Sequence, residues 1–219
     1  MNGTRLAGWI ALVGAISALN YYGRFTDNSS SSTVRDAVYS YSTFANGLVL
    51  YAVILGIVCA IAVDRWDLFA FRRPSSWPRA AGIAFVLWLL ILAWETVVTS
   101  LPIKNPGNEQ ALTPTHWEPA HAGAFAANCV LFVIVAPVVE ELTFRGVGQS
   151  LLSFLGRWPS IVLVGVAFGL WHGLVEALLV LVPFGIALAY LRDRTRSVVP
   201  GMVVHALFNG AALAASVLT

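Results

Sequence analysis

Residues 122–145 read AGAFAANCVLFVIVAPVVEELTFR, in which eighteen uncharged residues are followed directly by two carboxylates and, four residues later, an arginine. In water, Glu140, Glu141 and Arg145 would form an ordinary solvated helix face. A helix of about 20 apolar residues crosses the roughly 30 Å hydrocarbon core of a bilayer, and the uncharged run is close to that length. The meaning of the acidic pair therefore depends on whether the chain lies in a membrane.

The composition of the chain is typical of a membrane protein. Of its 219 residues, 58% are hydrophobic and 11% are charged, whereas soluble domains carry about 25% charged residues. Backbone groups in lipid must be hydrogen-bonded internally, so the expected elements are helices. The blocks that are nearly or wholly free of charge are Leu6–Tyr22, Thr43–Val63, Ala80–Leu101, Ala122–Val139, Ser160–Leu174, Ala177–Leu191 and Val198–Leu218. The sequence predicts an all-α, polytopic transmembrane bundle of about seven spans, with room for an eighth helix, in a single membrane domain over residues 1–219.

The first block allows a second interpretation. Residues 1–22 could be a cleaved signal peptide, because Arg5 precedes an apolar run that contains small residues. The flank Asn20–Tyr22 is more typical of an aromatic belt at the membrane interface, which favours a retained span. Cys59 and Cys129 both fall within apolar blocks, and we expect no disulfide between them.

The distribution of basic residues predicts the orientation, because Lys and Arg accumulate in cytoplasmic loops. With the N-terminus inside, the inner side holds Arg5, Arg65, Arg72, Arg73, Arg79, Arg145, Arg157, Arg192, Arg194 and Arg196, and the outer side holds Arg24, Arg35 and Lys104. We therefore expect a protein integral to the cell membrane, of prokaryotic plasma-membrane type, with a cytoplasmic N-terminus and an external C-terminus. The net charge of +2 reflects this topology and gives no reason to invoke nucleic acid.

The two parts of the chain differ in where their polar residues fall. In residues 1–120 the apolar blocks are separated by polar loops, and the inner loop 64–79 mixes Arg with Trp and Phe as segments at lipid headgroups do. From residue 121 the loops shorten, and polar residues enter the apolar blocks. We expect residues 1–120 to be lipid-packing helices and residues 121–219 to be a catalytic helical core.

Ionisable groups inside the membrane mark function or an internal pair. On a helix, Glu141 and Arg145 stand one turn apart and can pair, whereas Glu140 is turned about 100° away. We expect the three to end the fourth span on its inner side, and they could be interfacial charges only. Phe168 and His172 are four residues apart.

His205 and Asn209 repeat that spacing in the last span, which adds an imidazole and an amide to the set. A carboxylate in an apolar pocket can serve as a general base, and an imidazole can orient the water that it activates. A second imidazole and an amide can donate to an oxyanion, worth about 2.7–4 kcal/mol per donor. Two histidines and a glutamate could equally ligate zinc, although H-E-x-x-H is absent. No Ser or Cys stands beside a histidine at helical spacing, which disfavours a covalent nucleophile.

These motifs resemble those of the CPBP family, the CAAX-prenyl-protease and bacteriocin-processing intramembrane peptidases that are also called ABI proteins. The matching residues are E-E-x3-R at Glu140, Glu141 and Arg145, F-x3-H at Phe168 and His172, and H-x3-N at His205 and Asn209. The stretch RTRSVVPGMVVHALFN at 194–209 resembles the tail of that family. The resemblance covers about residues 130–212, and nothing in residues 1–120 contributes to it.

The resemblance implies an intramembrane endopeptidase of the glutamic type that hydrolyses a peptide bond with a glutamate-activated water. Glu140 would be the base, His172 would help to hold the water, and His205 and Asn209 would stabilise the oxyanion. The supporting residues would be Glu141, Arg145 and Phe168. No cofactor is implied, and zinc dependence stays an alternative. The expected partners are the lipid bilayer and a membrane-anchored or C-terminally tagged protein substrate, and the oligomeric state is left open.

Two other classes of function use the same residues. The site could be retained for binding alone, as in an immunity protein, or the chain could be a small proton-coupled transporter. Glu95 and Glu176 are the further acids that a proton relay would need. The sequence lacks the paired interrupted helices in matching halves that many transporters show.

Overall fold

The computed structural model describes residues 3–26, 36–101 and 117–218. Within these residues there are helices and no strands. The long helices are α1 (Gly3–Thr26), α3 (Tyr41–Ile61), α4 (Trp77–Ser100), a composite helix that runs from α5 to α7, α8 (Arg157–Trp171), α9 (Leu178–Thr195) and α10 (Val199–Leu218). Short 3₁₀ segments are η1 (Asp36–Tyr39), η2 (Trp66–Phe69), η4 (Pro119–His121) and η7 (Leu152–Leu155). Each predicted apolar block falls largely within one of the long helices, so the predicted all-α bundle is confirmed.

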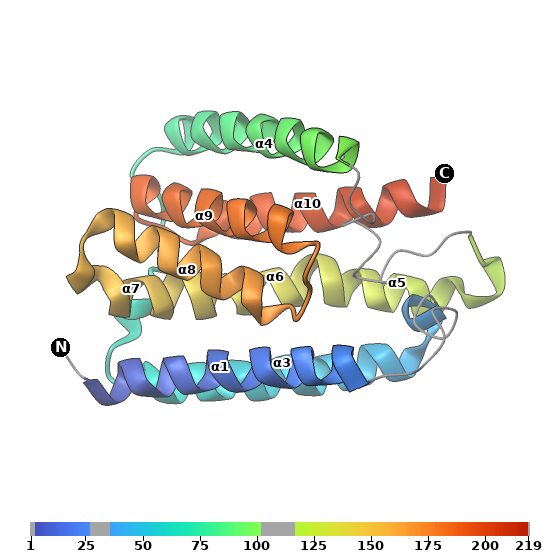
Figure 1. The fold of residues 1–219 in the computed structure, drawn as a ribbon, viewed down its shortest axis with the longest axis horizontal. Coiled ribbons are helices and arrows are strands. Elements are labelled where there is room, and N and C mark those ends of the chain that lie inside the picture. Colours follow the sequence, from blue (N-terminus) through green and yellow to red (C-terminus); the bar gives the residue numbers. More distant parts are fainter. Residues whose placement is uncertain (1–2, 27–35, 102–116, 219) are drawn as a thin grey trace.

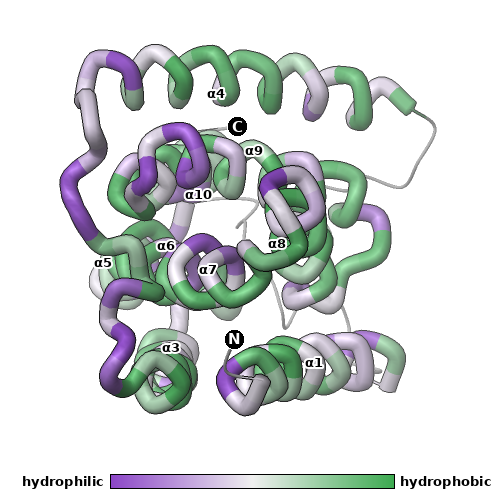
Figure 2. The backbone as a smooth tube through the Cα atoms, turned by 90° about the vertical axis from the view of Figure 1, so that its left-hand side faces the viewer, coloured by the Kyte–Doolittle hydropathy of each residue, from purple (hydrophilic) through white to green (hydrophobic). Residues whose placement is uncertain are grey.

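The helices pack side by side in layers (Figures 1 and 2). Helices α1 and α3 form one outer layer, and α4 forms the opposite one across α9 and α10. The composite helix and α8 lie between them.

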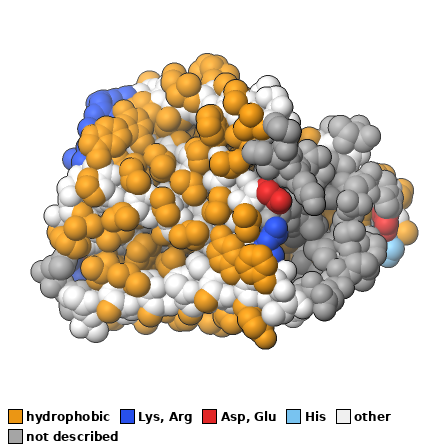
Figure 3. Space-filling model, viewed as in Figure 1, with side chains coloured by type: hydrophobic (Ala, Val, Ile, Leu, Met, Phe, Trp, Pro, Cys, Tyr) orange, Lys and Arg blue, Asp and Glu red, His pale blue; other side chains and the backbone are white. Residues whose placement is uncertain are grey.

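Hydrophobic side chains cover most of the visible described face (Figure 3), as expected where a protein meets lipid. Among the described residues, four helices are long and apolar enough to cross a membrane, namely α1, α3, α4 and Pro119–Leu155. Helix α8 and Val199–Ala215 are shorter apolar helices.

The fourth span differs from our expectation. The helix that contains it does not end near Val139, where the sequence predicted the inner end of the span. The composite helix continues through α5 (Ala122–Val130), a π segment (Leu131–Val135), α6 (Ala136–Glu141), a second π segment (Leu142–Gly148) and α7 (Gln149–Leu151). Glu140, Glu141 and Arg145 therefore lie inside a continuous helix, with 5%, 0% and 0% of their surface exposed. These charges therefore face the interior of the bundle and are not solvated surface charges.

Glycines allow α8 and α9 to approach closely. Gly165 and Gly169 stand one turn apart on α8, and a Cβ on Gly185 of α9 would lie 2.7 Å from the Gly165 carbonyl oxygen. Small residues at such positions permit close backbone contact in membrane helices. This packing brings the Gly185 carbonyl within 3.0 Å of the Arg145 guanidinium, so the helix contact also helps to hold a buried charge.

The orientation in the membrane stays a prediction. Figure 1 shows the two ends of the described chain at opposite ends of the bundle, as an odd number of crossings requires. Arg145 is buried and does not belong among the inner-loop charges, and Arg35 and Lys104 lie outside the described residues. We expect reporter fusions after Arg79 and after Arg196 to score as cytoplasmic. External signals from both fusions would reverse the assignment.

Candidate active site

The residues predicted for catalysis line one cavity of about 220 Å³ within the bundle. It receives side chains from α3, the composite helix, α8, α9 and α10. The predicted residues on its wall are Glu140, Phe168, His172, His205 and Asn209. Apart from Tyr51, the remaining wall is made of apolar side chains. A small space with convergent polar groups in apolar surroundings is the usual form of an active site.

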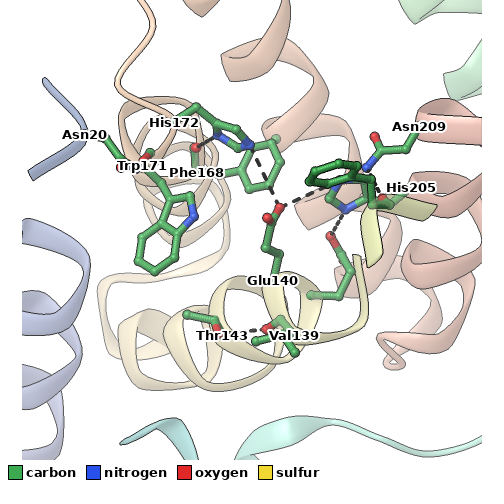
Figure 4. A network of polar contacts seen from close by, with 12 residues as sticks. Asn20, Val139, Glu140, Thr143, Phe168, Trp171, His172, His205 and Asn209 are labelled. Carbon is green, nitrogen blue, oxygen red and sulfur yellow. Dashed lines mark hydrogen bonds and ion pairs between the residues drawn. The ribbon is translucent and has the colours of Figure 1, made fainter. Parts of the chain in front are cut away.

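Glu140 lies at the centre of the polar groups (Figure 4). The Tyr51 hydroxyl donates a hydrogen bond of 2.9 Å to its Oε1. Its Oε2 lies 3.8 Å from His205 Nε2 and 4.0 Å from His172 Nε2. One carboxylate oxygen is therefore held in place, and the other faces two imidazoles at distances longer than a direct hydrogen bond.

Hydrogen bonds to the far side of each imidazole determine which nitrogen faces Glu140. His172 Nδ1 lies 2.8 Å from the Phe168 carbonyl oxygen, and His205 Nδ1 lies 3.3 Å from Glu141 Oε1. A carbonyl or carboxylate oxygen only accepts, so we assign the proton of each neutral ring to Nδ1. Both Nε2 atoms then face Glu140 as acceptors, and either can donate only after the ring takes a second proton.

The neighbouring carboxylate has a different environment. Arg145 Nη1 donates a hydrogen bond of 2.8 Å to Glu141 Oε1, the same oxygen that faces His205. The Arg145 guanidinium carbon lies 4.2 Å from the centre of the Phe168 ring. Glu141 does not line the cavity. The two adjacent glutamates thus point in different directions: Glu140 faces the cavity, and Glu141 forms a buried cluster that also positions an imidazole.

Phe168 links these groups through both its backbone and its ring. Its carbonyl oxygen holds His172, and its ring centre lies 4.8 Å from that imidazole and 5.6 Å from His205 in edge contacts. Because the same ring lies under Arg145, a change at Phe168 would disturb the buried cluster and both histidines together.

Asn209 bonds to the backbone of the composite helix. Its Nδ2 donates a hydrogen bond of 2.9 Å to the Phe132 carbonyl oxygen. In the π segment, the Ala136 N–H donates to the carbonyl oxygen of Leu131, five residues earlier. In the same register, the backbone N–H of residue 137 would donate to the Phe132 carbonyl oxygen, but residue 137 is a proline. Proline has no N–H, which leaves this carbonyl for Asn209. One amide hydrogen is used in this way, and the second remains for a ligand in the cavity.

Tyr51 is the residue of the site that sequence reasoning missed. It lies on α3, in the part of the chain expected only to pack against lipid, within the apolar block Thr43–Val63. A tyrosine in such a block needs a partner for its hydroxyl when it is buried, and this was the one available signal. The lipid-packing role of residues 1–120 is therefore incomplete, because α3 also contributes a contact to Glu140.

We expect Tyr51→Phe to lower the cleavage rate about tenfold, because a hydrogen bond to a charged group is worth about 1.5–3 kcal/mol and only part of that acts in the transition state. The melting temperature should change little. Tyr22→Phe, at a tyrosine that is 69% exposed, is the matched control. Equal rates for the two variants would remove Tyr51 from the site.

The zinc alternative concerns Glu140, His172 and His205. Among the residues that the structure describes, no group of three or more His, Cys, Asp or Glu side chains has an arrangement that could hold a metal ion.

One family model matches the part of the chain that contains the candidate site. Residues 122–211 match the family model described as "Rce1-like: Type II CAAX prenyl endopeptidase Rce1-like". The match runs from α5 into α10 and includes all the predicted site residues. Over residues 122–211 the chain is similar to the type II CAAX prenyl endopeptidases that this model describes, which supports the predicted resemblance to the CPBP family. No curated protein and no solved structure gave a significant match to the chain.

Proposed function

We propose that the chain is an intramembrane endopeptidase in which Glu140 activates water to hydrolyse a peptide bond of a membrane-associated protein. The observation that carries this proposal is the approach of two imidazole Nε2 atoms, at 3.8 and 4.0 Å, to one oxygen of a buried glutamate. Separations above 3.5 Å between polar groups suit a bridging water. The cavity of about 220 Å³ has room for water and for part of a peptide, since a water molecule takes about 30 Å³.

In the first step, a water held between Glu140 Oε2 and His172 Nε2 attacks the carbonyl carbon of the substrate. Glu140 takes a proton from this water while the new C–O bond forms, and the carbonyl electron pair moves to the oxygen. Tyr51 fixes the other oxygen of Glu140, so the base does not rotate away. Positioned proton transfer of this kind contributes about 10²–10⁴-fold to a rate.

The developing oxyanion needs donors on its other side. Asn209 offers its second amide hydrogen, and His205 donates from Nε2 when its ring is protonated, with Glu141 accepting from Nδ1. Collapse of the intermediate breaks the C–N bond, and the proton on Glu140 passes to the leaving amine nitrogen. Glu141 and Arg145 do not touch the substrate in this scheme and act by positioning His205.

The transporter and binding alternatives have less support. Neither Glu95 nor Glu176 lines the cavity, and Glu176 lies 3.8 Å from Arg24 in an ion pair. The acids that a proton relay would use are thus not joined to the site by any described contact. A protein that only bound its partner would not require a base with one oxygen held and the other facing two acceptor nitrogens.

The test is cleavage by the purified, reconstituted chain of three probes: a farnesylated CAAX peptide, the same peptide without the prenyl group, and a single membrane helix with a C-terminal tag. Mass spectrometry of the products identifies the bond. We expect at least one probe to be cut by the wild type and none by Glu140→Gln. The proposal fails if the wild type cuts no probe, or if the variant cuts as fast.

Cleavage should also survive strong chelators, and the purified protein should hold no stoichiometric zinc. The scheme above obtains its nucleophile from the carboxylate and needs no Lewis acid. Activity measurements with and without chelator, together with elemental analysis, check this expectation. Loss of cleavage in chelator with specific rescue by zinc would instead make Glu140, His172 and His205 metal ligands.

A further inference from the structure

A second polar pocket, of about 400 Å³, lies outside the catalytic cavity and shares no lining residue with it. Its charged wall consists of Arg79, Arg157, Arg192, Asp193, Arg194 and Arg196. These residues come from the beginning of α4, the beginning of α8 and the end of α9 together with the turn after it. Figure 3 shows Lys and Arg side chains gathered at the end of the molecule where α4 begins. Three helix ends that are distant in sequence thus form one basic pocket.

The positive charge of this pocket is only partly neutralised by the described residues. Arg157 Nε pairs with Asp193 at 2.8 Å, and Arg192 Nη2 donates to the Ser150 hydroxyl at 2.6 Å. Among the described residues, Arg79, Arg194 and Arg196 form no ion pair. The buried Nε of Arg192 also has no hydrogen-bond partner in this part of the chain. Clustered cations repel one another, so an anion in the pocket would remove both the repulsion and the unpaired donor.

The donors of the pocket suit a phosphate group. Arginine presents several N–H groups in a planar fork that matches phosphate oxygens. Gly156, which precedes α8, and Ser160 in its first turn also line the pocket. The N-cap Gly156 offers no side-chain hydrogen bond to the free N–H groups there. Such a helix N-terminus attracts anions through its N–H groups and its dipole.

Gln149 supplies a buried acceptor on the same wall. Only 2% of its surface is exposed, and its Nε2 donates to the Ala189 carbonyl oxygen at 3.0 Å. Its Oε1 has no hydrogen-bond donor among the described residues. An anion cannot satisfy this oxygen, whereas a hydroxyl or ammonium group attached to the phosphate can.

The surroundings place the pocket at the level of lipid headgroups. Trp158 at the beginning of α8 is 58% exposed and stacks on Tyr190, and Trp77 at the beginning of α4 is 52% exposed. Exposed tryptophans of this kind are enriched at membrane–water interfaces. Basic pockets between helix ends at this level bind anionic headgroups.

We propose that this pocket binds the phosphate group of an anionic membrane phospholipid whose headgroup also carries a hydrogen-bond donor, as phosphatidylglycerol does. The arginines contact the phosphate, and the donor reaches Gln149 Oε1. The site does not depend on the catalytic proposal, because none of its residues faces Glu140.

The test compares the melting temperature of the full chain in nanodiscs of phosphatidylcholine with that in nanodiscs that also contain phosphatidylglycerol. Binding to the folded state alone should raise the melting temperature by about 5 °C in the second case. Arg79→Gln and Arg194→Gln should each lose at least half of this shift. The matched control is Arg73→Gln, which removes the same charge from the neighbouring loop at a position that does not line the pocket.

Equal losses in Arg73→Gln and Arg194→Gln would show diffuse attraction to a charged surface and would overturn the site. Inorganic phosphate added to the protein in detergent, without phospholipid, separates the two sources of the anion. The same protection by phosphate alone would overturn the lipid assignment.

Native mass spectrometry gives a second readout that does not depend on melting. We expect phosphatidylglycerol adducts on the wild type and on Arg73→Gln, and fewer on Arg194→Gln, whereas equal adducts on all three would contradict the proposal.

Discussion

Glu140→Gln should abolish peptide cleavage while leaving a folded protein that still binds its substrate. Glutamine keeps the shape of the side chain, and its amide oxygen can still accept the hydrogen bond from Tyr51, which is 2.9 Å in the wild type. It cannot take the proton of the attacking water. A positioned general base contributes about 10²–10⁴-fold to a rate, and this loss should take the cleavage by Glu140→Gln below detection.

The measurement is the cleavage rate per folded molecule, with the melting temperature in detergent as the check on folding. Glu95→Gln is the matched control, because Glu95 lies in the apolar helix α4 and does not line the cavity. We expect that control to cut at a near-normal rate. A similar loss of activity in both variants would mean that removal of any membrane carboxylate disturbs the protein.

Glu141→Gln should have the larger effect on stability. Arg145 and Glu141 are both fully buried and joined at 2.8 Å, so loss of the carboxylate charge leaves the guanidinium without the carboxylate that is bonded to it directly. Removing one partner of a buried pair costs about 3–5 kcal/mol. The Gly185 carbonyl and the Phe168 ring still contact Arg145, but neither carries a compensating negative charge.

A double-mutant cycle separates this charge effect from simple loss of packing. We expect Glu141→Gln and Arg145→Gln each to lower the melting temperature strongly, and the double variant to cost clearly less than the two single changes together. Additive losses would show that the pair is not coupled. Glu141→Gln should also cut more slowly than the wild type, because Glu141 accepts from His205 Nδ1 and helps to orient that imidazole.

The fold was predictable to the extent that it follows from apolar block length. Each block became a helix because lipid leaves the backbone no other partner. The continuation of the fourth span past Glu140 could not be predicted in this way. In a sequence, a charged cluster indicates the end of a span unless the groups that bind its charges are known. Two of these groups, the Gly185 carbonyl and the His205 imidazole, lie on other helices. The α8–α9 contact through Gly165 and Gly185 that positions one of these partners is a tertiary property.

The candidate site was predictable where two of its residues stand four apart in the sequence, about one helical turn. The spacings of Phe168 to His172 and of His205 to Asn209 placed each pair on one face, and the structure brings both pairs to the cavity. The roles of these residues stay a prediction.

Tyr51 had no such pattern, because it is a single residue in a largely apolar block. The contact of Asn209 with Phe132 depends on a π segment and on Pro137, a local register that periodicity does not reveal. The arginines were informative about topology, but their assembly into a pocket depends on the packing of three helix ends.

The central claim is that Glu140, and not its neighbour Glu141, is the base. The most direct test is the cleavage rate per folded molecule of Glu140→Gln and Glu141→Gln, measured side by side on the same substrate with the folded fraction determined for each. We predict no measurable turnover for folded Glu140→Gln, and turnover that is reduced but present for the folded fraction of Glu141→Gln. Near-normal turnover in Glu140→Gln with none in folded Glu141→Gln would assign the base to the other residue, and activity in both would contradict the glutamate mechanism itself.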